Sequence, residues 1–179
     1  MTADLWLALG TVLICLILSA FFSGSETALT AASRARIHAL EKSGDAKAGI
    51  VNRLLSMRER LIGSILIGNN VVNILASSLA TSVLVALFGN AGVIYATAAM
   101  TVLVVVFSEV MPKTVAINAP DRMALLVARP VAFVVALIGP LTLAVEAIVR
   151  LTLRPFGIRI GENQTILSAR DELRGTVDL

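Results

Sequence analysis

The sequence is nearly devoid of the residues that bind transition metals or form disulfides. Cys15 is the only cysteine and His38 the only histidine among 179 residues. One cysteine cannot form a disulfide within the chain, and Cys15 lies inside an apolar run. Zinc and copper sites of the usual kind, which need clustered thiolates or imidazoles, are therefore excluded.

Charged and aromatic residues are also scarce. Only 15% of the residues are charged and 4% aromatic, whereas 57% are hydrophobic. The net charge of +3 could suggest nucleic-acid binding, but the basic residues lie between and after the apolar runs and do not alternate with aromatic residues. This distribution is the one that the positive-inside rule describes, so we expect a lipid bilayer and no nucleic acid as the partner.

Four apolar runs are candidates for crossing a hydrocarbon core about 30 Å thick. They are Leu5–Phe22, Leu61–Phe88, Val93–Phe107 and Met123–Leu153. The residues before the first run include Asp4 and no Lys or Arg, the reverse of a signal peptide, so we expect a retained membrane helix. The chain is therefore predicted to be an all-α, multi-pass protein of the cell membrane.

The charge distribution predicts the topology. The stretch between Arg34 and Arg60 is basic and is expected in the cytoplasm, which places the N-terminus outside. Within this stretch, Lys42–Asp45 predicts a turn between two short helices. Gly89–Gly92 predicts a tight outer turn, and the third run is expected to end near Pro112.

The fourth run is ambiguous. Pro130, Gly139–Pro140 and Glu146 should break the helix or spoil its apolar face, and arginines follow it. We expect a bent helix along the inner leaflet and a cytoplasmic C-terminus, and whether the run spans stays open. Residues 1–157 would form the transmembrane domain, and 158–179, with a helix start at Ser168, a cytosolic linker before a soluble domain.

Three polar clusters interrupt the first three runs at one depth. At about 1.5 Å per helical residue, Ser19 lies roughly 21 Å, Asn70 roughly 25 Å and Glu109 roughly 24 Å from the outer ends of their helices. Such residues are costly in lipid and indicate a functional site. The clusters comprise Ser19, Ser23–Thr27, Gly68–Asn70, Asn73, Ser108, Glu109, Pro112 and Lys113.

The donors in these clusters are hydroxyls, amides, freed carbonyls and the carboxylate of Glu109. Such hard oxygen ligands favour Mg²⁺, Ca²⁺ or Na⁺. Structural roles are the alternatives: the serines could bond to their own helix, the asparagines could join helices, Glu109 could pair with Lys113, and Glu26 could cap or form a salt bridge at the cytoplasmic edge.

Three stretches resemble the CorC/cyclin M family of magnesium transporters: Phe21–Leu29, Ile67–Ile74 and Phe107–Thr114. The resemblance implies a homodimer whose subunits each have three transmembrane helices and a belt of juxtamembrane helices on the cytoplasmic side. It also implies Mg²⁺ export in exchange for Na⁺. Family members continue into a cytosolic CBS-pair domain that binds ATP, which is absent from these 179 residues.

The resemblance also assigns site residues. The groups expected to bind Mg²⁺ are Ser19, Ser23, Asn70 and Glu109, with main-chain oxygens near Gly68 and Ser108. The candidates for Na⁺ coupling or for supporting the site are Ser25, Asn69, Asn73 and Glu26.

Other function classes remain as alternatives. A Mg²⁺-binding scaffold or sensor would use the same residues as a transporter, and so would a passive Mg²⁺ channel. A membrane hydrolase with Ser23 or Ser25 as nucleophile lacks a His or Lys at the same depth to act as base, so we do not expect an enzyme.

Overall fold

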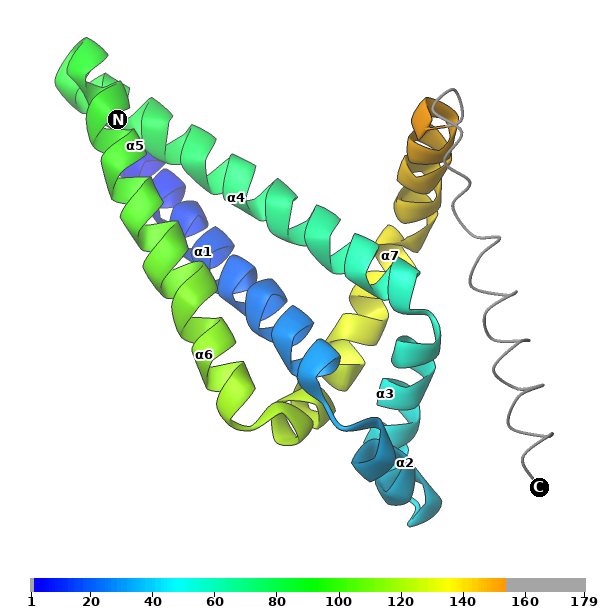
Figure 1. Ribbon diagram of the computed structural model, residues 1–179. Coiled ribbons are helices and arrows are strands. Elements are labelled where there is room, and N and C mark those ends of the chain that lie inside the picture. The colour runs from blue at the N-terminus through cyan, green and yellow to red at the C-terminus, as the bar shows by residue number, and fades with distance from the viewer. Residues whose placement is uncertain (1, 154–179) are drawn as a thin grey trace, which may run out of the picture. The chain divides into compact units, whose positions relative to one another are not determined.

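The computed structural model describes residues 2–153, and every element in that range is helical. The chain divides into two compact units, residues 1–139 and 140–179, and the boundary falls within the last helix. The elements are α1 Thr2–Ala31, α2 Arg34–Lys42, α3 Ala46–Ser56, α4 Arg58–Phe88, the 3₁₀ turn η1 Gly89–Ala91, α5 Gly92–Val102, the π-helical η2 Leu103–Val110, α6 Met111–Asn118 and α7 Pro120–Leu153 (Figure 1).

Three continuous helical stretches are long and apolar enough to cross a membrane: Asp4–Ala31, Arg58–Asn118 and Pro120–Leu153. The middle stretch has 61 residues and folds back at Gly89, whose φ of +61° suits glycine, so that α4 packs against α5. The turn expected at Gly89–Gly92 is thus confirmed, while its place on the outer side of the membrane stays a prediction. The multi-pass, all-helical character of the protein is confirmed as well, while the belt and the homodimer stay predictions.

The polar segment after α1 folds as predicted into two short helices. Asp45 begins α3 by accepting hydrogen bonds from the backbone N–H groups of Lys47 (2.8 Å) and Ala48 (3.4 Å). Gly44, just before it, has a φ of +95°, a conformation that a side chain would disfavour. The turn at Lys42–Asp45 therefore lies where the sequence placed it.

Two predictions of where a helix would end or break were wrong. The third run does not end near Pro112, because α6 continues to Asn118. Pro112 occupies the second position of α6, directly after the π-helical η2. Likewise, α7 is one helix through Pro130 and Gly139–Pro140, so these residues do not break it. The bend of this helix and its position along the inner leaflet stay predictions. The linker and helix start expected over 158–179 lie outside the described residues.

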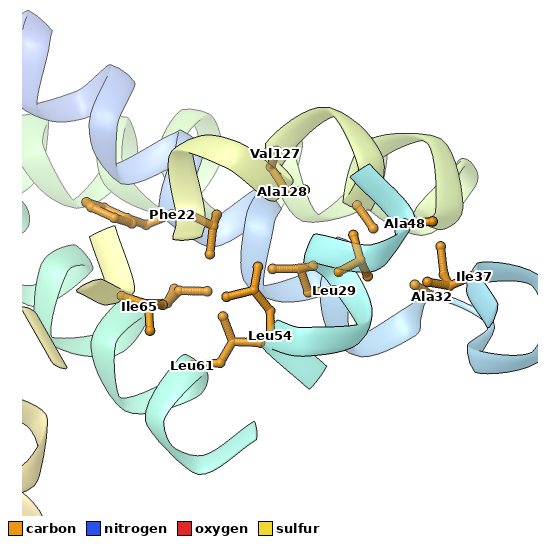
Figure 2. Packing of buried hydrophobic residues seen from close by; sticks show 14 residues of the cluster. Phe22, Leu29, Ala32, Ile37, Ala48, Leu54, Leu61, Ile65, Val127 and Ala128 are labelled. Atoms are coloured by element: carbon orange, nitrogen blue, oxygen red, sulfur yellow. The ribbon is translucent and has the colours of Figure 1, made fainter. Parts of the chain in front are cut away.

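A buried apolar core joins the short helices to the ends of the long ones. Figure 2 shows Leu29 of α1 near Leu54 of α3 and Leu61 of α4, and Val127 and Ala128 of α7 belong to the same cluster. A second cluster, around Cys15 and Met100, lies further along the helices. Cys15 is thus a packing residue.

Polar contacts fix α2 at the start of α7. The backbone N–H of Ser33 donates to Asp121 Oδ1 at 2.8 Å, and Arg36 Nη1 pairs with Asp121 Oδ2 at 2.6 Å. Ser33 is also the N-cap of α2, its hydroxyl accepting from the N–H of Arg36. One carboxylate therefore connects the α1–α2 junction to α7.

Candidate cation site

The helices that carry the predicted clusters pack closely in the first unit. Helix α1 contacts α4, η2 and α6 (Figure 1). A Cβ atom added at Gly68 would lie 2.8 Å from Phe22 Cζ, and one added at Gly24 would lie 3.4 Å from Pro112 Cβ. The two glycines thus allow the close approach of α1 to α4 and to α6.

Three buried serines, which we call the serine cluster, each donate a hydrogen bond to another helix. They are Ser19, Ser23 and Ser108, each at most 1% exposed. Ser19 Oγ donates to Asn69 Oδ1 of α4 at 2.8 Å, and Ser23 Oγ donates to the main-chain oxygen of Glu109 in η2 at 3.5 Å. In the other direction, Ser108 Oγ donates to the main-chain oxygen of Leu16 in α1 at 3.0 Å. The cluster therefore links three segments.

Hydroxyls elsewhere on the same helices behave differently. Thr27 and Thr30 donate to main-chain oxygens of α1 itself, at 3.3 Å and 2.8 Å, and Thr97 and Thr101 do so within α5. This is the ordinary arrangement in apolar helices. The hydrogen bonds of the serine cluster differ from it, since they run between helices.

The π-helical segment η2 presents Ser108 and Glu109 to α1. Over Leu103–Val110 the backbone has the wider π spacing, and at its end the N–H of Met111 donates to the oxygen of Val106, five residues back. Such segments are rare and frequently occur at functional sites. This one lies where Ser108 is fully buried and Glu109 half-buried.

Glu109 meets α1 through its main chain. Its carbonyl oxygen accepts the hydrogen bond from Ser23, so the residue lies beside the serine cluster. Among the described residues its carboxylate forms no ion pair with Lys113, which was the structural alternative for this side chain. In this part of the chain, the negative charge of Glu109 in η2 is therefore not neutralised by Lys113 of α6.

The two adjacent asparagines of α4 have different surroundings. Asn69 is half-buried and accepts from Ser19, whereas Asn70 is exposed on the surface of the single chain. Consecutive helical residues point about 100° apart, so one orientation of α4 cannot aim both at α1. The structure thus brings together Ser19, Ser23, Asn69, Ser108 and Glu109, and leaves Asn70 on the neighbouring side of α4.

Two further predicted residues have buried oxygens without a hydrogen-bond partner in the described part of the chain: Ser25 Oγ of α1 and Asn73 Oδ1 of α4. Unpaired buried oxygens are unfavourable, and each needs an explanation such as a bound ion or water. Glu26, the last predicted residue, is half-buried, and its main-chain oxygen accepts from Thr30.

Asn73 also opens onto a groove that the sequence analysis did not identify. The groove, between α4 and α5, has a volume of about 350 Å³. We call it the polar groove. The polar residues that line it are Asn73, Ser77, Thr81, Thr97 and Thr101. The spacing of four residues along each helix was the signal that could have revealed it.

The chemistry offered by this region is that of neutral oxygens with one carboxylate. No three His, Cys, Asp or Glu side chains gather to hold a metal within residues 2–153. A serine hydroxyl that donates its hydrogen to a neighbour keeps its lone pairs, which can then face a cation. Such an arrangement suits a hard cation that must also leave.

Comparison with known proteins gives a consistent family. Residues 10–179 match the family described as the cyclin M transmembrane N-terminal domain. The UPF0053 inner membrane protein YfjD of Escherichia coli K12 is 42% identical over 164 residues, which cover 89% of this chain and 37% of that protein. A UPF0053 protein of Haemophilus influenzae is 34% identical over 166 residues, covering 93% of this chain and 39% of its own length.

A chloroplastic DUF21 domain-containing protein of Arabidopsis thaliana is 35% identical over 166 residues, which cover 92% of this chain and 25% of that protein. The chain thus spans less than half of the length of each of these relatives.

Proposed function

Because this chain belongs to the family of cyclin M transmembrane N-terminal domains, we propose that it is the membrane domain of a Mg²⁺ transporter that exports Mg²⁺ in exchange for Na⁺. The observation that carries the proposal is the serine cluster, in which hydroxyls of α1 and η2 donate hydrogen bonds between helices, one of them to the main-chain oxygen of Glu109.

The proposed ion lies among the serine cluster and Glu109. Mg²⁺ requires a near-octahedral set of oxygens and gives up its waters reluctantly. Ser19, Ser23 and the Glu109 carboxylate would supply side-chain ligands, and main-chain oxygens near Gly68 and Ser108 would add to them. A single carboxylate neutralises half of the ion's charge, so that the ion is held but can also be released.

Asn70 can join this set only if its surroundings change. It is exposed in the single chain, while Asn69 occupies the position facing Ser19. A turn of α4 about its axis would exchange the two amides. A second subunit would cover Asn70 from outside, which fits the homodimer that the family resemblance implies. Of these two changes, only the rotation would bring Asn70 to the cage proposed from the sequence.

Na⁺ exchange has its own support in the unpaired oxygens. Ser25 Oγ, two residues after Ser23 in α1, and Asn73 Oδ1, four residues after Asn69 in α4, are unsatisfied in the described chain. Na⁺ accepts hydroxyl and amide oxygens and would satisfy them. The polar groove, which begins at Asn73, would serve as the path between the site and the Gly89 end of the helices.

The orientation follows the charge rule: the N-terminus outside and the C-terminus in the cytoplasm. The family resemblance also implies regulation by ATP through a CBS-pair domain. Mg²⁺ flux through these 179 residues can be measured without a CBS-pair domain.

The proposal is tested by Mg²⁺ flux into liposomes that contain the purified chain and a Mg²⁺ indicator. We expect Glu109→Gln to lower the flux at least about tenfold, because removing a charged ligand costs about 1.5 kcal/mol or more. Glu59→Gln is the matched control: Glu59 is an exposed carboxylate in the first turn of α4 and should leave the flux unchanged.

Near-normal flux through Glu109→Gln would contradict the proposal. Mg²⁺ binding without any flux would instead support a scaffold or sensor, and flux that does not respond to a Na⁺ gradient would support a passive channel.

A further inference from the structure

A second pocket lies at the opposite end of α4 from the Gly89 turn. It has a volume of about 370 Å³ and is formed by α3, the start of α4 and α7, all within the first unit. Its wall is apolar except for two arginines, and no carboxylate lines it. The lining residues are Ile50, Arg53, Leu54, Met57, Arg60, Ala132, Val135 and Ala136.

Arg60 is the unusual member of this lining. Its Nε atom is buried and has no hydrogen-bond partner in the described part of the chain. The guanidinium lies against Gly139 of α7, and a Cβ added at Gly139 would overlap it. A guanidinium has five N–H donors in a rigid fork and is always charged, so a buried unpaired donor there calls for an anion.

The position of the pocket indicates which anion. A helix of 31 residues is about 45 Å long, which exceeds a hydrocarbon core of about 30 Å, so that one end of α4 reaches the headgroups. Arg60 immediately precedes the apolar run that begins at Leu61, and the polar helices α2 and α3 lie just before it. We therefore expect the two arginines at the depth of lipid phosphates.

The shape and the polarity of the lining agree with a lipid. Six of the eight lining residues are apolar and can contact the first carbons of an acyl chain, while Arg60 and the exposed Arg53 reach a phosphate. Arginine forms paired, charge-assisted hydrogen bonds to phosphate oxygens. Basic pockets between membrane helices bind anionic headgroups in this way.

We infer that this pocket binds one anionic phospholipid, with Arg60 and Arg53 on its phosphate and the apolar wall against its acyl chain. The inference does not depend on Mg²⁺ transport, since none of the residues of the serine cluster lines the pocket.

The test is native mass spectrometry of the chain extracted from vesicles that contain equal amounts of phosphatidylglycerol and phosphatidylcholine. The chain is expected to retain phosphatidylglycerol selectively. Arg60→Gln should lower the retained amount at least about fivefold, the effect of one arginine at an anionic surface. Gly139→Ala should also lower it, because the added methyl group displaces the guanidinium without changing any charge.

Arg53→Gln keeps the inference testable if Arg60→Gln does not fold, because Arg53 is exposed and its loss should still weaken retention. Arg34→Gln removes an exposed arginine of α2 outside the pocket and should change nothing. Equal retention of phosphatidylglycerol by the wild-type chain, Arg60→Gln and Arg53→Gln would overturn the inference. Displacement of the lipid by millimolar inorganic phosphate would also overturn it, as the site would then recognise a soluble anion.

Discussion

The serine cluster and the polar groove contain similar side chains but use them differently. In the serine cluster, hydroxyls donate to neighbouring helices, for example Ser108 to the oxygen of Leu16. In the polar groove, the hydroxyls of Thr81, Thr97 and Thr101 donate to oxygens within their own helices. Groove hydroxyls therefore keep their hydrogen bonds when the helices move apart, whereas those of the cluster do not.

This difference teaches that polarity within membrane helices has at least two physical roles. Hydrogen bonds between helices fix the relative position of α1, α4 and η2, and so keep ligands in place. Hydrogen bonds within a helix leave its surface polar without constraining its neighbour, which suits a path that must open and close. The comparison can be tested by substitutions that should lower stability in the serine cluster or at its helix contacts and not elsewhere on the same helices.

The largest effect on stability is expected for Gly68→Ala. The new methyl group would lie 2.8 Å from Phe22 Cζ, and Phe22 is only 6% exposed, so its ring has little room to move. Overpacking of this kind costs about 1–3 kcal/mol. We expect a lower Tm in detergent, measured by thermal unfolding, and a disturbed contact between α1 and α4.

The matched control is Gly10→Ala, since Gly10 lies in α1 with no atom within 4 Å of an added Cβ. Alanine is a better helix former by about 1 kcal/mol, so this variant should be as stable as the wild-type chain or more stable. If both variants had the same Tm, the close approach of Phe22 to α4 would not be a feature of the protein in solution.

A smaller effect is expected for Ser108→Ala, which removes the hydrogen bond to Leu16. Hydrogen bonds between membrane helices contribute about 0.6 kcal/mol on average. Thr101→Val, which keeps the shape of the side chain and removes a bond within α5, should change the free energy of unfolding by less than about 0.5 kcal/mol. If Thr101→Val lowered the free energy of unfolding more than Ser108→Ala, the comparison between the serine cluster and the polar groove would be reversed.

Much of the fold could be predicted from the sequence, because turns and spans depend on local chemistry. Gly44 and Gly89 mark turns at which the backbone has positive φ, and apolar runs reveal the helices. The effect of proline could not be predicted as well. Pro112 follows a π-helical segment whose wider spacing the sequence does not reveal, and it lies in the first turn of the next α-helical segment and does not end the helix.

The site could be predicted in part. Polar residues in apolar helices predicted that the segments with Ser19, Ser23 and Glu109 would meet, as the hydrogen bonds between them show, but not which amide of α4 faces α1. The depth of these residues in the bilayer stays a prediction. The choice of amide depends on the rotation of α4 about its axis, and a helix that is apolar on all sides gives no periodic signal for it. The polar groove was missed for a related reason: its threonines are common in membrane helices, and only the packing of α4 against α5 brings them together.

The central claim is that oxygens of separate helices meet because a cation lies among them. The most direct test is an experimental structure of the chain in Mg²⁺, with the ion's ligand distances measured. We predict an ion among Ser19, Ser23 and the Glu109 carboxylate at about 2.0–2.1 Å from its oxygens. A structure saturated with Mg²⁺ that shows no ion there, with the Glu109 carboxylate directed away from Ser23, would contradict the account.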